Sequence, residues 1–190
     1  MTIPNMMLSE AKREEIEPGG YIVEVISTNI DTKYNRLQLN VDIATGPKAG
    51  YFTRLQKRAN FWGLTANLSL DEKDAWKFKN AVDAMRDSDP TFVWEDDAEN
   101  DEAEMVGVNV GAITQRLHYM GNDGTKKSKL LIYRLVPVDV IKSGDYEVPD
   151  DLYAEELQKP RPAGGQVVDT TAPDPVEAFG EISDDDIPFA

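Results

Sequence analysis

The chain has 190 residues, of which 41% are hydrophobic and 29% charged, and its formal net charge is −15. This length suits one domain of ordinary size or two small ones, with enough buried surface to fold without covalent staples. The chain has no cysteine and one histidine, His118, which excludes disulfide scaffolds, thiolate metal sites and thiol catalysis. No apolar run is long enough for a membrane span. The segment 1–17 lacks a signal-peptide pattern, so we expect a cytoplasmic protein.

The negative charge is concentrated in two segments. Residues 95–104 carry −7 and residues 160–190 carry −6, so the rest of the chain carries −2 and holds 19 of the 20 basic residues. A nearly neutral body permits a local basic surface, and the global charge therefore does not exclude nucleic-acid binding.

The C-terminal segment is rich in proline and glycine and poor in aliphatic residues. Such a composition cannot bury enough apolar surface to offset the entropy of ordering. We therefore predict a folded domain over residues 1–158 and a disordered acidic tail over 159–190. The acidic stretch Glu95–Glu104 is predicted to be a solvated loop.

The first half of the body has the patterns of β-strands. Gly19-Gly20 marks a turn, and the Val- and Ile-rich run Tyr21–Ile30 follows it. Arg36–Ile43 alternates with period 2, which is typical of a half-buried strand that pairs with the first one as a hairpin. Tyr51–Arg58 is predicted to be a third strand.

A helix and two further strands follow. Ser69 and Glu72 have the spacing of a capping box, and the helix that it opens is expected to end before Asp89-Pro90. The Val-rich run from Val106 toward Tyr119 and the run Lys129–Val138 flank a strong hairpin turn at residues 121–124. The order of three strands, one helix and two strands predicts an all-β, five-stranded oligonucleotide/oligosaccharide-binding (OB) barrel, with its helix between strands three and four.

The chain ends on three carboxylates followed by Ile-Pro-Phe and a final Ala190. This end closely resembles the C-terminal tip of bacterial and phage single-stranded-DNA-binding proteins, although the family tip usually ends on the Phe. The resemblance implies an OB barrel, a disordered linker, a tip that docks onto replication, recombination and repair proteins, and a phage-encoded protein acting in the host cytoplasm. The residues that it assigns to partner binding are Asp184, Asp185, Asp186, Ile187, Pro188 and Phe189.

Strand binding without sequence preference requires cations for the backbone and aromatic rings on which bases stack. Basic and aromatic residues are interleaved at three places in the body. The candidate nucleic-acid-binding residues are Lys33, Tyr34 and Arg36; Arg54, Lys57, Arg58, Phe61 and Trp62; and Arg116, His118, Tyr119, Lys126, Lys127, Lys129 and Tyr133.

Several of these residues also have a structural interpretation. Phe61 and Trp62 are equally consistent with base stacking and with core packing. The lysines at 126, 127 and 129 are also typical of a solvated turn or a protected sheet edge. Trp76 is assigned to core packing and Trp94 to the boundary of the acidic loop.

Two other functional classes remain open. The acidic stretch Glu95–Glu102 contains oxygen ligands for Mg²⁺ or Ca²⁺, which would suit a metal-dependent nuclease, but it lacks the spacing of a calcium loop. An acidic DNA mimic or adaptor acting on a host DNA-processing enzyme also fits the net charge. No nucleophile motif or phosphate-binding loop is present. We therefore expect a binding protein without enzymatic activity, cofactor or membrane association. Its expected partners are single-stranded DNA and tail-binding proteins. A homo-oligomer is possible, and the sequence leaves the oligomeric state open.

Overall fold

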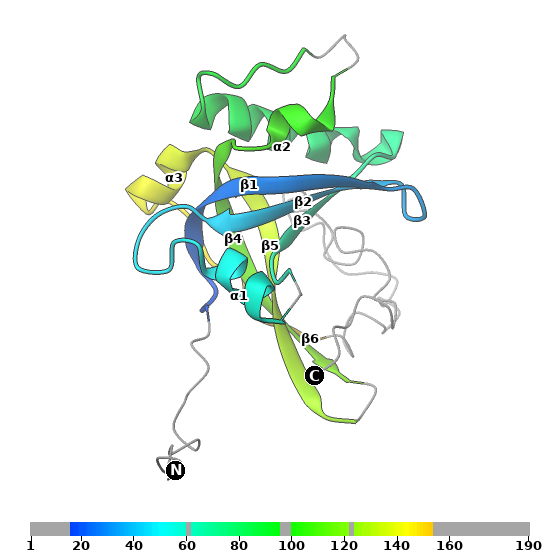
Figure 1. The fold of residues 1–190 in the computed structure, drawn as a ribbon, viewed down its shortest axis with the longest axis vertical. Helices are drawn as coiled ribbons and strands as arrows, with labels where there is room; N and C mark the ends of the chain where they lie inside the picture. Colours follow the sequence, from blue (N-terminus) through cyan, green and yellow to red (C-terminus); the bar gives the residue numbers. More distant parts are fainter. Residues whose placement is uncertain (1–15, 60–61, 96–99, 122–123, 154–190) are drawn as a thin grey trace, which may run out of the picture.

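The computed structural model describes residues 16–59, 62–95, 100–121 and 124–153. Its centre is a mostly antiparallel sheet in which the first five strands have the order β3-β2-β1-β4-β5 and β6 pairs with β4 (Figure 1). The strands are β1 (Gly20–Asp31), β2 (Arg36–Ile43), β3 (Thr65–Ser69), β4 (Asn109–Met120), β5 (Lys126–Val136) and β6 (Leu152–Tyr153); the helices are α1 (Tyr51–Ala59), α2 (Ala75–Ser88) and α3 (Val138–Ser143).

Side-chain alternation on β2 separates a core face from an outward face. Leu37, Leu39 and Val41 are buried, and they pack with Val23 and Val25 of β1. The sheet brings β3 into contact with β5, although the strand order is that of an open sheet. The prediction is thus confirmed in its coarser part: the fold is mostly β, with an open antiparallel sheet and a helix between β3 and β4.

The predicted third strand at Tyr51–Arg58 is wrong, because these residues form helix α1. The buried Asp42 carboxylate accepts hydrogen bonds from the backbone N–H groups of Phe52 (2.9 Å) and Thr53 (2.8 Å), which caps the first turn. The third strand instead lies at Thr65–Ser69, where it pairs with β2.

Helix α2 ends at Ser88, as predicted from Asp89-Pro90, but the predicted capping box is wrong. Ser69 is the last residue of β3, and a short 3₁₀ helix, Glu72–Asp74, precedes α2. The helix contacts β3, β4 and β5 and buries Ala81, Val82 and Met85. The assignment of Trp76 to the core is also wrong, because its side chain is 44% exposed at the start of the helix.

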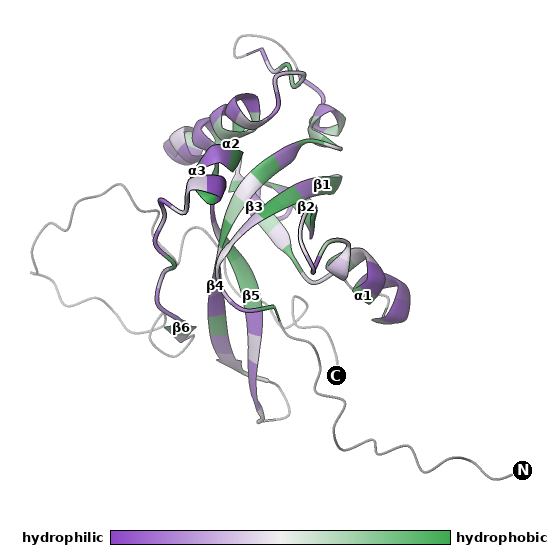
Figure 2. Cartoon of the chain, turned by 90° about the vertical axis from the view of Figure 1, so that its left-hand side faces the viewer, coloured by the Kyte–Doolittle hydropathy of each residue, from purple (hydrophilic) through white to green (hydrophobic). Residues whose placement is uncertain are grey.

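Strands β4 and β5 form the hairpin that the glycine turn predicts, and it projects beyond the rest of the sheet as an arm (Figure 1). Figure 2 shows that hydrophilic residues gather toward the tip of this arm and on α1. The two predicted strands of this hairpin differ from β4 and β5 only at their ends. Helix α3 and strand β6, which pairs with β4 at Leu117 and His118, were not predicted. No helix in the described ranges is both long and apolar enough to cross a membrane.

Candidate nucleic-acid interface

The tip of the β1–β2 hairpin is held in one conformation by Asp31. One carboxylate oxygen accepts hydrogen bonds from the backbone N–H groups of Lys33 (3.1 Å) and Tyr34 (3.4 Å), and the other pairs with Arg36 at 3.0 Å. Asn35 adopts the left-handed conformation with φ +47°, which Asn tolerates in tight turns. The turn is therefore preorganised around the Tyr34 ring.

Two cations lie over that ring. The Lys33 Nζ atom is 4.6 Å from the ring centroid and the Arg36 guanidinium carbon is 4.8 Å from it. Lys33 is exposed, whereas Arg36 is only 8% exposed. The structure therefore argues against Arg36 as a direct nucleic-acid-binding residue, because its guanidinium pairs with Asp31 and lies over Tyr34 inside the protein.

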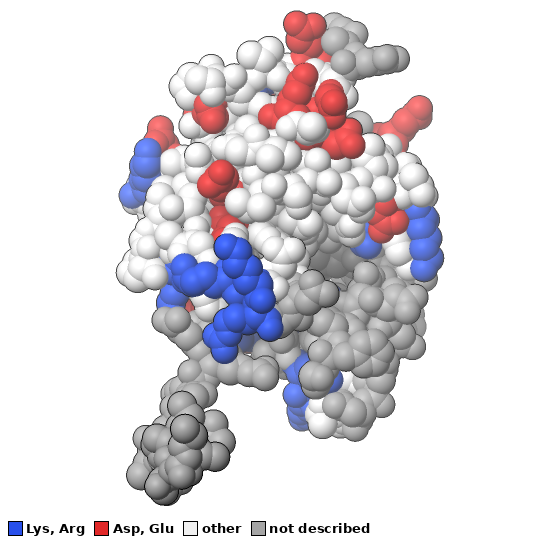
Figure 3. Space-filling model, viewed as in Figure 1, with Lys and Arg blue, Asp and Glu red and all other residues white. Residues whose placement is uncertain are grey.

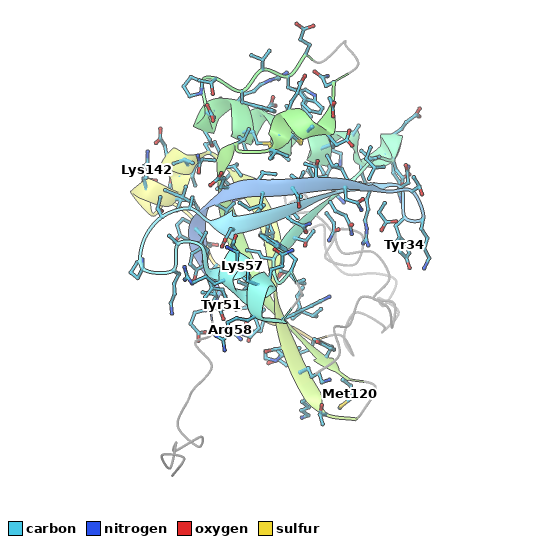
Figure 4. All side chains as sticks on the ribbon, viewed as in Figure 1. Tyr34, Tyr51, Lys57, Arg58, Met120 and Lys142 are labelled. Atoms are coloured by element: carbon cyan, nitrogen blue, oxygen red, sulfur yellow. The ribbon has the colours of Figure 1, made fainter. Side chains whose placement is uncertain are left out.

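Helix α1 supplies the second basic cluster. Arg54, Lys57 and Arg58 are exposed on it. In Figure 3 a blue patch covers the region of α1, while acidic side chains gather nearer to α2. Figure 4 places Lys57 and Arg58 on this helix, away from Tyr34 at the hairpin tip. The helical conformation brings these three side chains together, so the predicted cluster exists on a different element from the one expected.

The two aromatic residues that follow α1 have different outcomes. Phe61 lies outside the described residues. Trp62 is half-buried, packs against the core and donates a hydrogen bond from Nε1 to the Leu64 carbonyl oxygen at 2.8 Å. Between stacking and core packing, the structure thus favours core packing for Trp62.

The third predicted cluster is divided between the two faces of the β4–β5 arm. Directly opposed residues of antiparallel strands share a face. Tyr119 lies opposite Lys127, and Leu117 lies opposite Lys129, so Tyr119 and these two lysines gather on one face. The other face carries Arg116, His118 and Lys126, and Tyr133 lies at the irregularity in the β4–β5 pairing.

Arg116 and His118 have partners within the protein. Arg116 pairs with Glu17 at 2.9 Å and its side chain is 15% exposed. Burial and the Glu17 carboxylate raise the pKa of the neighbouring Tyr21, an effect that Arg116 partly offsets. The His118 ring stacks on Tyr153 with centroids 4.9 Å apart, and its Nε2 lies 2.8 Å from an Asp151 oxygen. Of these two residues, His118 is the more accessible.

The prediction missed two rows of uncharged polar side chains on the outward face of β1, β2 and β3. Register aligns Asn29, Gln38 and Asn67 in one row, and Ser27, Asn40 and Thr65 in the other. We call these six residues the amide face. The outward positions of β2 gave a signal, because Gln38 and Asn40 alternate with buried aliphatic residues, but only basic and aromatic residues were considered.

The tail and its tip lie outside the described residues, so the partner-binding assignment of Asp184–Phe189 stays a prediction. The acidic loop is described only in part; within it Glu102–Met105 forms a 3₁₀ helix. Among the residues that the structure describes, no group of three acidic or histidine side chains is arranged to hold a metal ion.

No protein-family model matches the chain, and a search of curated proteins finds no match. The function is therefore inferred from the chemistry of the interface itself. The exposed Lys33 beside the Tyr34 ring lies at one end of an uncharged polar sheet face, and the exposed cations of α1 lie at the other. The β4–β5 arm with its lysines extends from the same sheet. Such a surface can bind an extended polyanion that also presents aromatic, hydrogen-bonding groups.

Proposed function

We propose that this chain is a single-stranded-DNA-binding protein whose body is an OB-type barrel. The strand order β3-β2-β1-β4-β5, the helix between β3 and β4, and the contact of β3 with β5 support the barrel. In barrels of this kind, oligonucleotides bind across strands two and three, between the loop that joins strands one and two and the loop that joins strands four and five. Here the loop between β1 and β2 carries Lys33 and Tyr34, and Lys126 and Lys127 begin β5 directly after the loop that joins it to β4.

The observation that carries the proposal is the arrangement along the outward face of β2. Arg36, beside Tyr34, lies at one end of this strand, and Asp42, which caps α1, lies at the other. They are six residue steps apart along the strand, or about 20 Å at ~3.4 Å per residue. A flexible single strand can follow this face and place phosphates near the cations at both ends.

The physical mechanism is binding rather than chemistry. Lysine and arginine side chains release counterions from the phosphates they contact, which makes affinity fall with salt. Tyr34 offers a π-face that any base can use, so stacking favours exposed bases without demanding one sequence. A duplex keeps its bases stacked on each other and gains only the electrostatic part. We therefore infer a clear preference for single strands.

The acidic tail completes the proposal. Its Asp-Asp-Asp-Ile-Pro-Phe sequence suits a partner with a small apolar pocket and a basic rim, and the resemblance points to replication, recombination and repair proteins. With the folded domain on single-stranded DNA and the tail tip on such a partner, the partner would lie beside exposed DNA.

Nuclease protection tests this function. The full-length protein is mixed with a labelled single-stranded oligonucleotide or the matching duplex, and each is digested with a nuclease that cleaves it. Protection of the single strand alone is expected. A DNA mimic would protect neither substrate, and degradation without added nuclease, abolished by a chelator, would indicate the metal-dependent nuclease instead.

A further inference from the structure

Within each row of the amide face, each side chain donates a hydrogen bond to the next one along the row. In the first row, Asn29 donates to Gln38 at 3.0 Å and Gln38 donates to Asn67 at 3.4 Å. In the second row, Thr65 donates to Asn40 at 2.8 Å and Asn40 donates to Ser27 at 3.0 Å. The two rows therefore run in opposite directions across the same three strands.

These rows have hydrogen-bonding capacity left over. An amide group has two N–H donors and an oxygen with two lone pairs, and a hydroxyl has one donor. Within the described residues, the first row does not use the Asn67 amide N–H groups, which lie at its β3 end. The second row does not use the Ser27 hydroxyl hydrogen, which lies at its β1 end. All six residues are half-buried or exposed, so solvent or a ligand reaches them.

The face carries no formal charge of its own, while cations lie at its two ends. Neutral amides contribute little to phosphate neutralisation, but their paired donor and acceptor match the edges of nucleobases. In a single strand these edges are unpaired and accessible. The mutual hydrogen bonds within each row hold the side chains in place, which reduces the ordering cost of binding.

We propose that the amide face recognises base edges of the bound single strand by hydrogen bonds, and so adds a base-dependent, salt-independent component to the affinity. This inference rests on the proposed function and deepens it. Coating would occur on any sequence, and the amide face would give the protein a graded preference among bases.

The test compares equal-length dA, dC and dT homopolymers bound to the full-length protein over a range of salt concentrations. The variants are Gln38→Val and Asn67→Val, since a β-branched residue suits a strand but removes the amide. Asn80→Ala, an exposed amide on α2, is the matched control. Thermal unfolding checks that each variant folds, and having two separate variants keeps the test valid if one fails.

Each amide variant should lose about fivefold or more in affinity for the homopolymer that the wild type prefers, and the three affinities should converge. The slope of log K against log salt should stay unchanged, because every phosphate keeps its cation. Unchanged differences among homopolymers in folded variants would overturn the inference while leaving the proposed function intact. Absence of binding to every homopolymer by the wild type would overturn the function itself.

Discussion

The guanidinium carbon of Arg36 lies 4.8 Å from the centroid of the Tyr34 ring. Arg36 is buried and paired with Asp31, so it is a support for the ring rather than a ligand for phosphate. Lys33, the other cation over the ring, is exposed. We therefore propose Tyr34, on this preorganised tip, as the main stacking residue of the interface.

Replacement of Tyr34 tests this assignment. Tyr34→Ala should weaken single-strand binding by about 1–3 kcal/mol, the contribution of one base stack. Tyr34→Phe keeps the ring and should retain most of the affinity. Titration of an oligonucleotide followed by anisotropy measures both variants. Equal affinities for the Ala variant and the wild type would show that no base stacks there.

The cations of α1 should act through phosphate. The double variant Lys57→Ala with Arg58→Ala should lower affinity, and it should reduce the slope of log K against log salt by ~0.7 for each phosphate that the variant no longer neutralises. Lys142→Ala removes an exposed lysine on α3, at a distance from α1 in Figure 4, and is the matched control. A slope that changes equally in both proteins would contradict a specific role for α1.

Asp42 holds α1 on the sheet. Asp42→Ala would leave the backbone N–H groups of Phe52 and Thr53 without their acceptor. Loss of a cap and of buried hydrogen bonds is expected to cost about 1–3 kcal/mol of unfolding free energy. Urea unfolding measures this change. The exposed acid Asp87 on α2 offers the control, because Asp87→Ala should change stability by less than about 0.5 kcal/mol.

Asp74 should make stability depend on acid pH. Burial of this carboxyl group acts to raise its pKa, but hydrogen bonds from Lys77 and Ser69 and the charge of Lys77 outweigh burial, so the pKa lies below its ordinary value of 3.8. A lowered native pKa stabilises the fold above pH 3.8, and that contribution is lost as the pH falls through the native value.

The difference in unfolding free energy between the wild type and Asp74→Asn should therefore be full at about pH 5 and above, and should shrink below about pH 3.8. Urea unfolding at a series of pH values measures it, with Asp87→Asn as the control. A difference that stays constant down to about pH 2 would mean that the ion pair with Lys77 does not form.

Removal of residues 183–190 separates the two proposed activities. The truncated protein loses three consecutive carboxylates, so its affinity for single strands should be equal to that of the full chain or slightly higher, with the larger gain at low salt. Binding to replication, recombination or repair proteins should disappear. A truncated protein with weaker DNA binding would show that the tip contributes to the DNA interface.

Strand patterns predicted much of the fold. The alternation in Arg36–Ile43 and the glycine turn at 121–124 are local signals, and both hairpins form as expected. Helix α1 was mistaken for a strand because its start depends on Asp42, nine residues before Tyr51 and on another element. A cap supplied from that distance leaves no capping residue beside the helix to be recognised.

The types of residue in the candidate site could be predicted from the sequence, but their arrangement in space could be predicted only in part. The exposed cations of α1 and of the hairpin tip were predicted, because basic residues and turn residues are recognisable from short stretches of sequence. It did not show that Arg36 is buried, because that depends on its pairing with Asp31 across the hairpin. The amide face was missed because its six residues come from three strands and gain meaning only once the register aligns them.

Fluorescence anisotropy of labelled oligo-dT, compared with a duplex of the same length at low and moderate salt, distinguishes a single-strand-binding protein from the alternatives. We expect tight binding to the single strand that weakens with salt, and little binding to the duplex. Absence of binding to the single strand at either salt concentration would contradict the proposed function, and the acidic tail would then have to be explained by a mimic or adaptor role.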